Sequence, residues 1–407
     1  MQVVHERCCG LDVHKKMVVA CLLTPGESGR TTKEVRTFST VTRDLLALAD
    51  WLGSAGCTHI AMESTGSYWK PVYNILEGTF HILVVNAQHM KAVPGRKTDV
   101  KDAEWIADLL RHGLLRASFI PDRASRDLRE LTRYRTSLIR ERSAEVNRIQ
   151  KVLEGGNIKL ASVASNVVGV SGRAMLSAMI AGVDEPAALA DLAQGRLREK
   201  RDLLEVALEG RMTQHQRFLL NVQLRHLVDL DRSIEQVGTE IEARLSPFSE
   251  AAARLMTIPG VGLRTAQTIL AEVGADLSRF PSDAHLASWA GLCPGHHESA
   301  GKRTSGRTRK GSPWLRSALV EAAQAAGRSK TYLGEHFHRL AARRGKKRAS
   351  VATAHTILVI VYHILAEQRT YEDLGVHYFD QRNQDRTTRR LVRKLESFGY
   401  QVSLQAA

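Results

Sequence analysis

The chain has few of the features that mark secreted, zinc-binding or membrane proteins. Its five cysteines include no Cys-x-x-Cys pair, so we expect neither a disulfide framework nor a thiolate zinc site, and a reducing cytoplasm fits best. The N-terminus lacks the basic-then-apolar order of a signal peptide. No apolar run is long enough to cross a bilayer, and the longest late run, 356–366, contains His363. We therefore interpret that run as a buried helix and expect no membrane partner.

Charge, by contrast, is abundant and unevenly placed. The 407 residues carry a net charge of +15, and Lys302 to Arg348 alone holds 14 Lys and Arg against two acids. A solvated basic face is the plain explanation of such a run. A concentration this strong favours phosphate binding, and nucleic acid is the commonest polyanion partner.

Residues 7–120 alternate between strand-like and helix-like segments. The pattern predicts two strands joined by a tight polar turn at 14–16, a third strand, and then alternating helices and strands. The order is that of an α/β RNase H-like fold. The expected strands are 8–13, 17–23, 35–39, 58–63 and 80–85, and the expected helices are 42–52, 68–76 and 99–112.

The rest of the chain reads as mainly helical. Apolar residues at helical spacing predict a long amphipathic helix over 122–153 and a second helical region over 201–245 with a near-heptad seam. An ordinary bundle core and a coiled coil that joins two chains both remain open for that seam. The expected domains are an α/β domain, 1–121; a helical coiled-coil connector, 122–250; a domain with a helix-hairpin-helix and a serine loop, 251–330; and a basic helical tail, 331–407.

Four carboxylates stand at the ends of expected elements. Asp12 ends the first strand, Glu63 ends a later strand, and Asp99 and Asp102 lie three apart at a helix start, where they share one face. Mg²⁺ prefers carboxylate and phosphate oxygens, and paired ions suit phosphodiester displacement. Each acid alone fits a turn or a helix cap equally well. A Gly-Leu-Asp strand end also opens actin-like sugar kinases, but their later glycine-rich phosphate loops are not found here.

Two further motifs suit nucleic acid. The segment 258–262, Ile-Pro-Gly-Val-Gly, lies between two expected helices, as in a helix-hairpin-helix whose Gly260 and Gly262 let backbone amides reach a phosphate. A plain helix corner that needs glycine is the alternative. Farther on, Ser299 lies in a small-residue loop among cations that suit a phosphate. Those cations are Lys302, Arg307, Lys310 and Arg316.

Together these motifs resemble the DEDD transposases of bacterial insertion sequences, family one-ten, whose mobile elements encode a bridge RNA. The ordered matches are Gly-Leu-Asp-Val-His-Lys, Met-Glu-Ser-Thr-Gly-Ser-Tyr, Lys-Thr-Asp-x-x-Asp-Ala, Pro-Gly-Val-Gly and Ala-Gly-Leu-x-Pro with the serine segment after it. The family often has Ser-Gly-Gly-Lys where this chain has Ser-Ala-Gly-Lys at 299–302.

The resemblance implies a RuvC-like, metal-dependent catalytic domain over 1–121, a transposase domain over 251–330, and the following site residues and partners. It implies that Asp12, Glu63, Asp99 and Asp102 bind Mg²⁺, with Mn²⁺ as a substitute, and that a catalytic serine is Ser299, with Ser305 as the fallback. It also implies donor and target DNA, a bridge RNA and a homo-oligomer, dimer or tetramer, at the bacterial nucleoid.

We therefore expect a transposase that cuts and rejoins DNA through a serine nucleophile. Two alternatives stay open on the residues. A RuvC-like structure-specific endonuclease would use the four acids with water, and a non-catalytic DNA-binding protein would use only the hairpin motif and the basic region. A covalent protein–DNA adduct is expected for the transposase and for neither of the two alternatives.

Overall fold

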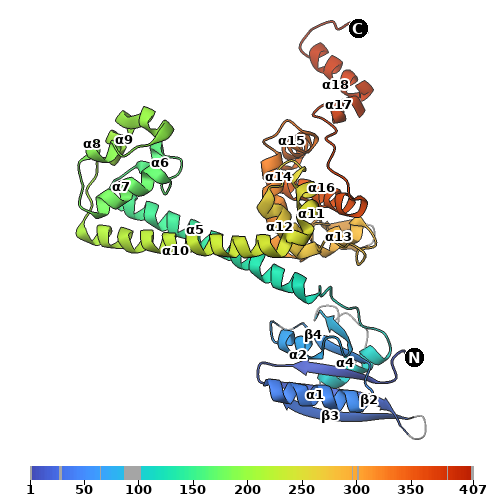
Figure 1. Cartoon of the computed structure of the whole chain (residues 1–407). Helices are drawn as coiled ribbons and strands as arrows, with labels where there is room; N and C mark the ends of the chain where they lie inside the picture. Colours follow the sequence, from blue (N-terminus) through green and yellow to red (C-terminus); the bar gives the residue numbers. More distant parts are fainter. Residues whose placement is uncertain are drawn as a thin grey trace. The chain divides into compact units, whose positions relative to one another are not determined.

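The computed structural model describes residues 2–26, 30–64, 66–86, 102–295, 297–299, 302–382 and 384–404. The chain divides into two compact units, Met1–Pro121 and Asp122–Ala407. The first is built on a mixed sheet and the second is mostly helical (Figure 1).

Unit 1 contains a five-stranded sheet in the order β3-β2-β1-β4-β5. Strands β1, β2 and β3 pair antiparallel, whereas β4 pairs parallel with β1 and β5 parallel with β4. The expected tight turn is present, since the His14 amide donates to the Met17 carbonyl at 2.9 Å. The strands are β1 (Cys8–Val13), β2 (Met17–Pro25), β3 (Thr31–Ser39), β4 (His59–Glu63) and β5 (His81–Val85). Strand β3 begins at Thr31, earlier than expected, because it pairs along the whole of β2.

Helices cover both faces of this sheet. Helices α1 (Thr42–Ser54) and α2 (Trp69–Leu76) share one apolar core with alternate β1 residues, among them Leu11. Helix α4 (Asp102–Arg111) packs on the other face, in a core that includes Cys8. The alternation along β1 therefore divides its side chains between two helical layers.

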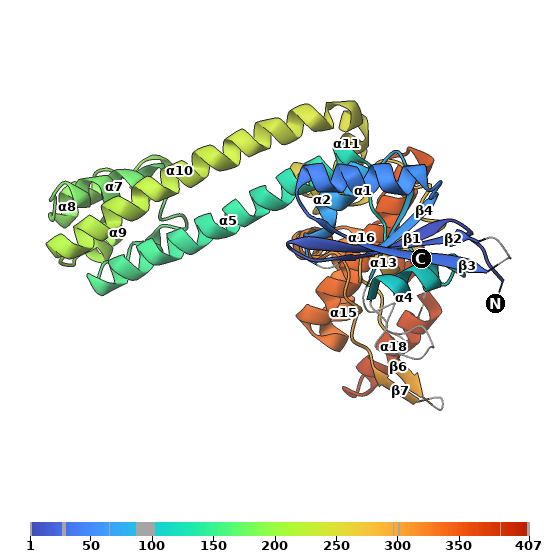
Figure 2. The ribbon, with the colours of Figure 1, turned by 90° about the horizontal axis from the view of Figure 1, so that it is seen from below.

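Unit 2 begins with a rod of two long helices, α5 (Arg123–Gly155) and α10 (Gln214–Leu245), which run side by side (Figure 2). They are antiparallel, because ion pairs join Asp127 to Arg244 and Arg142 to Asp231. The near-heptad seam of α10 faces α5 of the same chain, with Leu138, Leu230 and Ile234 in one cluster. The apolar seam of α10, for which a second chain was one expected partner, thus packs against α5 of the same chain.

One end of the rod carries a small helical cap. Its short helices share a core with both rod helices and are α6 (Leu160–Val163), α7 (Val170–Ile180), α8 (Pro186–Ala190), η1 (Gly195–Lys200) and α9 (Arg201–Leu208). The helical region expected over 201–245 is broken at 209–213, where Gly210 passes the Gly156 carbonyl so closely that an added Cβ would lie 2.5 Å from its oxygen. Helix α10 then starts afresh with a capping box between Thr213 and Gln216.

The other end of the rod meets a C-terminal bundle. Helix α16 (Lys346–Glu367) packs against α13 (Asp283–Trp289), α14 (Pro313–Ala326) and α15 (Tyr332–Arg344), so residues 332–367 belong to the bundle, whereas the basic tail was expected to begin at residue 331. The bundle elements are η2 (Ser246–Phe248), α11 (Ser249–Met256), α12 (Leu263–Val273), α13 (Asp283–Trp289), β6 (His297–Ser299), β7 (Lys302–Ser305), α14 (Pro313–Ala326), α15 (Tyr332–Arg344) and α16 (Lys346–Glu367). Helices α17 (Tyr378–Arg382) and α18 (Gln384–Glu396) follow.

Helix α16 is long and apolar enough to cross a membrane by length and composition. Its residues Ala354, Ile357, Leu358 and Val361 are fully buried within the bundle. The expectation of a buried helix over 356–366 is confirmed, and the apolar character of α16 is that of a core helix.

Candidate catalytic edge and nucleic-acid-binding elements

The register of the sheet brings two of the expected acids to one edge. Strands β1 and β4 pair in parallel with Gly10 opposite Ala61 and Leu11 opposite Met62. Continued by one residue, the same register sets Asp12 opposite Glu63. Paired residues of neighbouring strands point to the same face, so both carboxylates lie on the face that α4 covers. The Asp12 side chain is 25% exposed there.

Gly10 explains how α4 comes to that edge. A Cβ on Gly10 would lie 2.3 Å from the Ala103 carbonyl oxygen and 2.4 Å from the Ala107 amide, so only glycine allows this approach. Cys8, two residues earlier on the same face, has its Sγ 3.8 Å from the Ala107 carbonyl oxygen. The helix therefore runs opposite to β1, and its N-terminus points toward the Asp12 end of the strand.

Asp102 is the first residue of α4 and thus stands at the end of the helix nearest this edge. Its carboxylate also suits the positive end of the helix dipole. Asp99 lies outside the described residues. Among the described residues alone, no three His, Cys, Asp or Glu side chains converge as metal ligands would.

His14 is a neighbour that sequence reasoning did not assign. Its Nε2 lies 2.9 Å from Asp12 Oδ2, and its side chain is 55% exposed. The signal was present in the motif Gly-Leu-Asp-Val-His-Lys, because a histidine two residues after a strand-end aspartate returns to the same face. The imidazole can donate a hydrogen bond to the carboxylate and orient it.

The serine segment forms a short β-hairpin between α13 and α14. Its base is narrow: Gly291, with φ +69°, and Gly311 pass so closely that a Cβ on Gly291 would lie 2.7 Å from the Gly311 amide. Backbones of Ser299 and Lys302 pair across the hairpin. The side chains of both residues lie outside the described part of the structure. Ser305 Oγ accepts a hydrogen bond from the Arg307 amide at 3.1 Å.

The Ile-Pro-Gly-Val-Gly segment joins α11 to α12, between two helices as expected. Gly260 has φ +86° and packs on α14, where a Cβ would lie 2.2 Å from the Ala322 carbonyl oxygen. Gly262 precedes the first residue of α12, and no side chain caps that helix. Both glycines are exposed, so the amides at the start of α12 can be reached by an anion.

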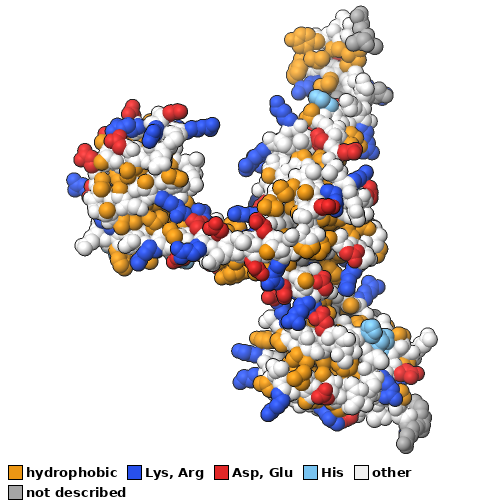
Figure 3. Space-filling view, in the orientation of Figure 1, with side chains coloured by type: hydrophobic (Ala, Val, Ile, Leu, Met, Phe, Trp, Pro, Cys, Tyr) orange, Lys and Arg blue, Asp and Glu red, His pale blue; other side chains and the backbone are white. Residues whose placement is uncertain are grey.

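Cations of the basic segment are largely exposed and unevenly paired with acids. Arg307 and Lys310 are exposed, and Arg316 at the start of α14 is half-buried. Along the α5–α10 rod, by contrast, Lys and Arg alternate with acids (Figure 3), as in the pair of Arg232 with Asp229. The C-terminal bundle is therefore the more suitable surface for a phosphate backbone.

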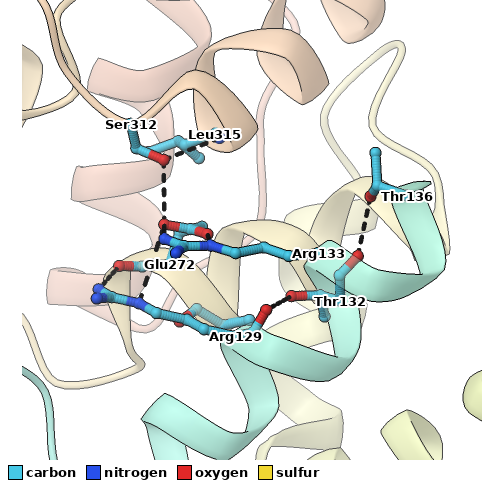
Figure 4. A network of polar contacts seen from close by, with 8 residues as sticks. Arg129, Thr132, Arg133, Thr136, Glu272, Ser312 and Leu315 are labelled. Carbon is cyan, nitrogen blue, oxygen red and sulfur yellow. Dashed lines mark hydrogen bonds and ion pairs between the residues drawn. The ribbon is translucent and has the colours of Figure 1, made fainter. Parts of the chain in front are cut away.

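A buried charge network that the local sequence patterns did not predict joins α5 to this bundle. Glu272 of α12 is fully buried, and Arg133 donates to its two carboxylate oxygens at 2.7 and 2.9 Å (Figure 4). Arg129 donates to the Ala271 carbonyl at 3.0 Å, and burial lowers the pKa of Arg129 to about 10. Ser312, the N-cap of α14, donates to Glu272 at 3.1 Å.

Comparison with known proteins identifies the family. Residues 9–158 match a family model described as "Transposase", and residues 252–339 match "Transposase IS116/IS110/IS902 family". The transposase for insertion sequence element IS1111A of Coxiella burnetii is 27% identical over 78% of this chain and 79% of its own length. A probable family 20 transposase of Pseudomonas aeruginosa is 27% identical over 77% and 85%. A pilin gene-inverting protein of Moraxella bovis is 31% identical over 37% and 47%.

The mixed sheet and these two matched segments define a DNA transposase. The chain belongs to the IS116/IS110/IS902 transposase family. Its substrates are accordingly DNA, which enzymes of this class cleave and rejoin.

Proposed function

We propose that unit 1 is an RNase H-like, metal-dependent catalytic domain whose carboxylate edge activates the DNA backbone. The observation that carries this proposal is the β1–β4 register, which ends with Leu11 opposite Met62 and so brings the next residues, Asp12 and Glu63, to one edge, with the N-terminus of α4 directed there. The strand order, with an antiparallel half and a parallel half, supports the fold assignment.

The residues fit divalent metal. Three carboxylates from separate elements, with Asp99 as the fourth, would supply an all-oxygen donor set, which is the set that Mg²⁺ prefers and Mn²⁺ accepts. Such a metal supplies charge stabilisation to a phosphodiester under attack. Asp12, Glu63, Asp99 and Asp102 would hold it, and His14 would orient Asp12 through their hydrogen bond.

The proposed nucleophile is Ser299. Its Oγ would form a phosphoserine bond to one DNA end and release a hydroxyl of the other strand segment. In religation, the hydroxyl of the exchanged strand would attack the phosphoserine, form a new phosphodiester and release the serine hydroxyl. Support comes from the family resemblance and from the cations around the hairpin, which suit a phosphate. The fallback, Ser305, already accepts a hydrogen bond from the Arg307 amide, which fits a structural role better than attack.

The remaining parts of the proposal concern binding. The α11–α12 corner acts as a helix-hairpin-helix on the DNA backbone, and the α5–α10 pair is a coiled-coil connector within one chain. A bridge RNA pairs with donor and target DNA, and a dimer or tetramer carries out the exchange. The hydrophobic seam supports the connector, because Leu138 and Ile234 pack across it.

The decisive experiment is adduct trapping on both DNA ends. Asp12→Asn, Glu63→Gln and Ser299→Ala should each bind DNA, and none should form an adduct that survives denaturation. The matched control is Asp50→Asn, because Asp50 is an exposed acid on α1, on the opposite face of the sheet. Recombination with and without RNA transcribed from the flanking element DNA tests the guide.

Two results would refute parts of the proposal. Normal recombination by Asp12→Asn and Glu63→Gln in Mg²⁺ would remove the carboxylate edge from the mechanism. Hydrolysis without any adduct in the wild type would favour the structure-specific endonuclease, which needs the acids but not the serine. An adduct mapped to Ser305 would move the nucleophile.

A further inference from the structure

The turn between β1 and β2 carries two lysines that have no part in the mechanism proposed so far. Lys15 and Lys16 follow Asp12 by three and four residues, and both are exposed. Within the ranges that the structure describes, neither ammonium group has a carboxylate within ion-pair distance. Lys33 of β3 differs, because its ammonium lies 2.7 Å from the Glu104 carboxylate. The two turn lysines are therefore cations that are free to meet a phosphate.

The backbone of this turn is held in place by Thr40, which directly follows β3. Thr40 Oγ1 donates a hydrogen bond to the Lys15 carbonyl at 3.0 Å, and the Thr40 amide donates to the Lys16 carbonyl at 3.2 Å. The His14 amide closes the turn on the Met17 carbonyl at 2.9 Å. Three hydrogen bonds thus fix the backbone from which both ammonium groups extend, which lowers the ordering cost of binding.

A side chain of the turn also contacts the carboxylate edge. The Nε2 atom of His14, the first residue of the turn, lies 2.9 Å from Asp12 Oδ2. Asp12 is the last residue but one of β1, so the turn begins directly beyond the end of the strand at which the acid stands. A DNA strand that reaches Asp12 therefore also passes beside Lys15 and Lys16.

A DNA strand that approaches this edge meets charges of its own sign. Three carboxylates, those of Asp12, Glu63 and Asp102, stand at or near it. The repulsion between phosphates and carboxylates grows where water is excluded. A divalent metal offsets it at the phosphate under attack, but the neighbouring phosphates of the strand lie outside the coordination sphere of that metal. Cations beside the acids are needed to hold those neighbours.

We infer that Lys15 and Lys16 bind backbone phosphates beside the scissile one and so position the DNA strand on the carboxylate edge. This inference rests on the proposed catalytic role of that edge and extends it to the contact with the substrate. A lysine is a compact charge on a flexible stem, so these contacts hold the backbone and carry no sequence information. Both are positioning residues, because neither acts on the reacting atoms.

The first test measures binding of duplex DNA from the element end by fluorescence anisotropy in EDTA over a series of salt concentrations. Lys15→Met and Lys16→Met should each reduce the slope of log K against log salt by about 0.9, the value for one phosphate, and the double variant by about twice that. Lys15→Arg and Lys16→Arg should keep the wild-type slope. Lys33→Met is the matched control, since Lys33 is already paired with Glu104 and lies toward the opposite end of the sheet.

Removing an acid should have the opposite sign. In EDTA and at low salt, Asp12→Asn should bind the same DNA about fivefold more tightly, because it removes a charge that repels the strand. In Mg²⁺, the double lysine variant should need about tenfold more DNA for half-maximal cleavage and keep its rate at saturating DNA, as expected for lost binding that is uniform along the reaction. A general loss of folding would produce neither the opposite signs nor this division.

Methylphosphonate substitution locates the contact on the DNA. A neutral methylphosphonate placed at each position in turn should weaken wild-type binding at the phosphates beside the cleavage position, and should leave the double lysine variant unaffected there. Equal losses in both proteins at every position, or an unchanged salt slope in the double variant, would overturn the inference. A slope change with an RNA duplex and none with DNA would also overturn it, because the lysines would then hold a different strand.

Metal binding separates failure of this inference from failure of the catalytic edge. Mn²⁺ binding, measured by the loss of the free-ion electron paramagnetic resonance signal, should be weakened by Asp12→Asn and unchanged by the lysine variants. Weakened Mn²⁺ binding in Asp12→Asn together with wild-type DNA binding in the lysine variants would overturn the lysine contacts alone. Normal Mn²⁺ binding and normal recombination by Asp12→Asn would overturn the edge, and with it the position that the lysines are inferred to serve.

Discussion

The two units hold a key helix by opposite means. In unit 1, α4 lies on the sheet through a contact between backbones, which Gly10 makes possible by having no side chain. In unit 2, α5 is held to the bundle by side chains of opposite charge, with Glu272 fully buried among Arg129, Arg133 and Ser312. The contact at Gly10 is disrupted when a side chain is added, whereas the network at Glu272 is destabilised when one of its charged partners is removed.

The difference decides what each region positions. The Gly10 contact directs the N-terminus of α4 to the edge where Asp12 and Glu63 end their strands. The Glu272 network fixes the N-cap of α14, Ser312, which directly follows the base of the serine hairpin at Gly311. Both proposed reactive elements thus depend on a contact that lies several residues away from the chemistry.

The largest expected effect comes from removing the buried acid. Glu272→Ala leaves Arg133 and Arg129 without their carboxylate and should lower the free energy of unfolding by about 3–5 kcal/mol. Urea unfolding, with hydrogen exchange in α12 and α14 as the local readout, measures it. Glu250→Ala, at an exposed pair with Arg254, should change stability by less than about 1 kcal/mol. Equal effects of the two substitutions would mean that the network adds nothing to the bundle.

Filling the backbone contact in unit 1 should come next. Gly10→Val forces atoms into the space of Ala103 and Ala107 and should cost about 3 kcal/mol of stability, with faster hydrogen exchange in β1 and α4. Gly53→Ala on α1 is the matched control, because a Cβ there meets nothing within 4 Å. Normal exchange in α4 of the Gly10→Val variant would contradict the close approach.

A smaller loss is expected at the N-cap of α14. Ser312 accepts a hydrogen bond from the Leu315 amide at 3.3 Å and donates one to Glu272. Ser312→Ala removes the cap and one contact to a buried carboxylate, together about 2 kcal/mol. Ser312→Thr should retain most of that stability. If alanine and threonine behave alike, Ser312 does not link the network to the helix.

This comparison also explains how far the sequence could predict the molecule. Short-range patterns predicted the five strands, the long helix that became α5 and the break at 258–262, because strand alternation and helical periodicity are local. The motif Gly-Leu-Asp holds both the glycine of the close contact and the strand-end aspartate within three residues. The position of this aspartate at the end of the strand could therefore be predicted.

Contacts between residues that lie far apart in the chain could not be predicted from the sequence. Arg133 and Glu272 are 139 positions apart, and each looks like an ordinary helical charge in its own segment. The α10 seam had the right spacing for a coiled coil, but spacing does not say whether the partner helix belongs to the same chain. The break between α9 and α10 was also not predicted, because it depends on the contact between Gly210 and Gly156.

The smallest expected effect is a gain, and it concerns the rod. Gly238 lies inside α10, its φ is not in the left-handed region, and a Cβ there would meet nothing within 4 Å. Glycine inside a helix costs about 0.5–1 kcal/mol relative to alanine, so Gly238→Ala should raise the free energy of unfolding by about that amount. Gly10 and Gly238 would then show opposite signs for the same chemical change, an added side chain.

Recombination measured alongside stability makes this last prediction more informative. If Gly238→Ala is more stable and equally active, the glycine has no contact role and the rod is held by its seam and ion pairs. If the variant is more stable but loses recombination, the open space at Gly238 is used for the close approach of DNA, RNA or a second protomer during the reaction. A loss of stability would contradict the open environment itself, since no described atom lies near enough to oppose a methyl group.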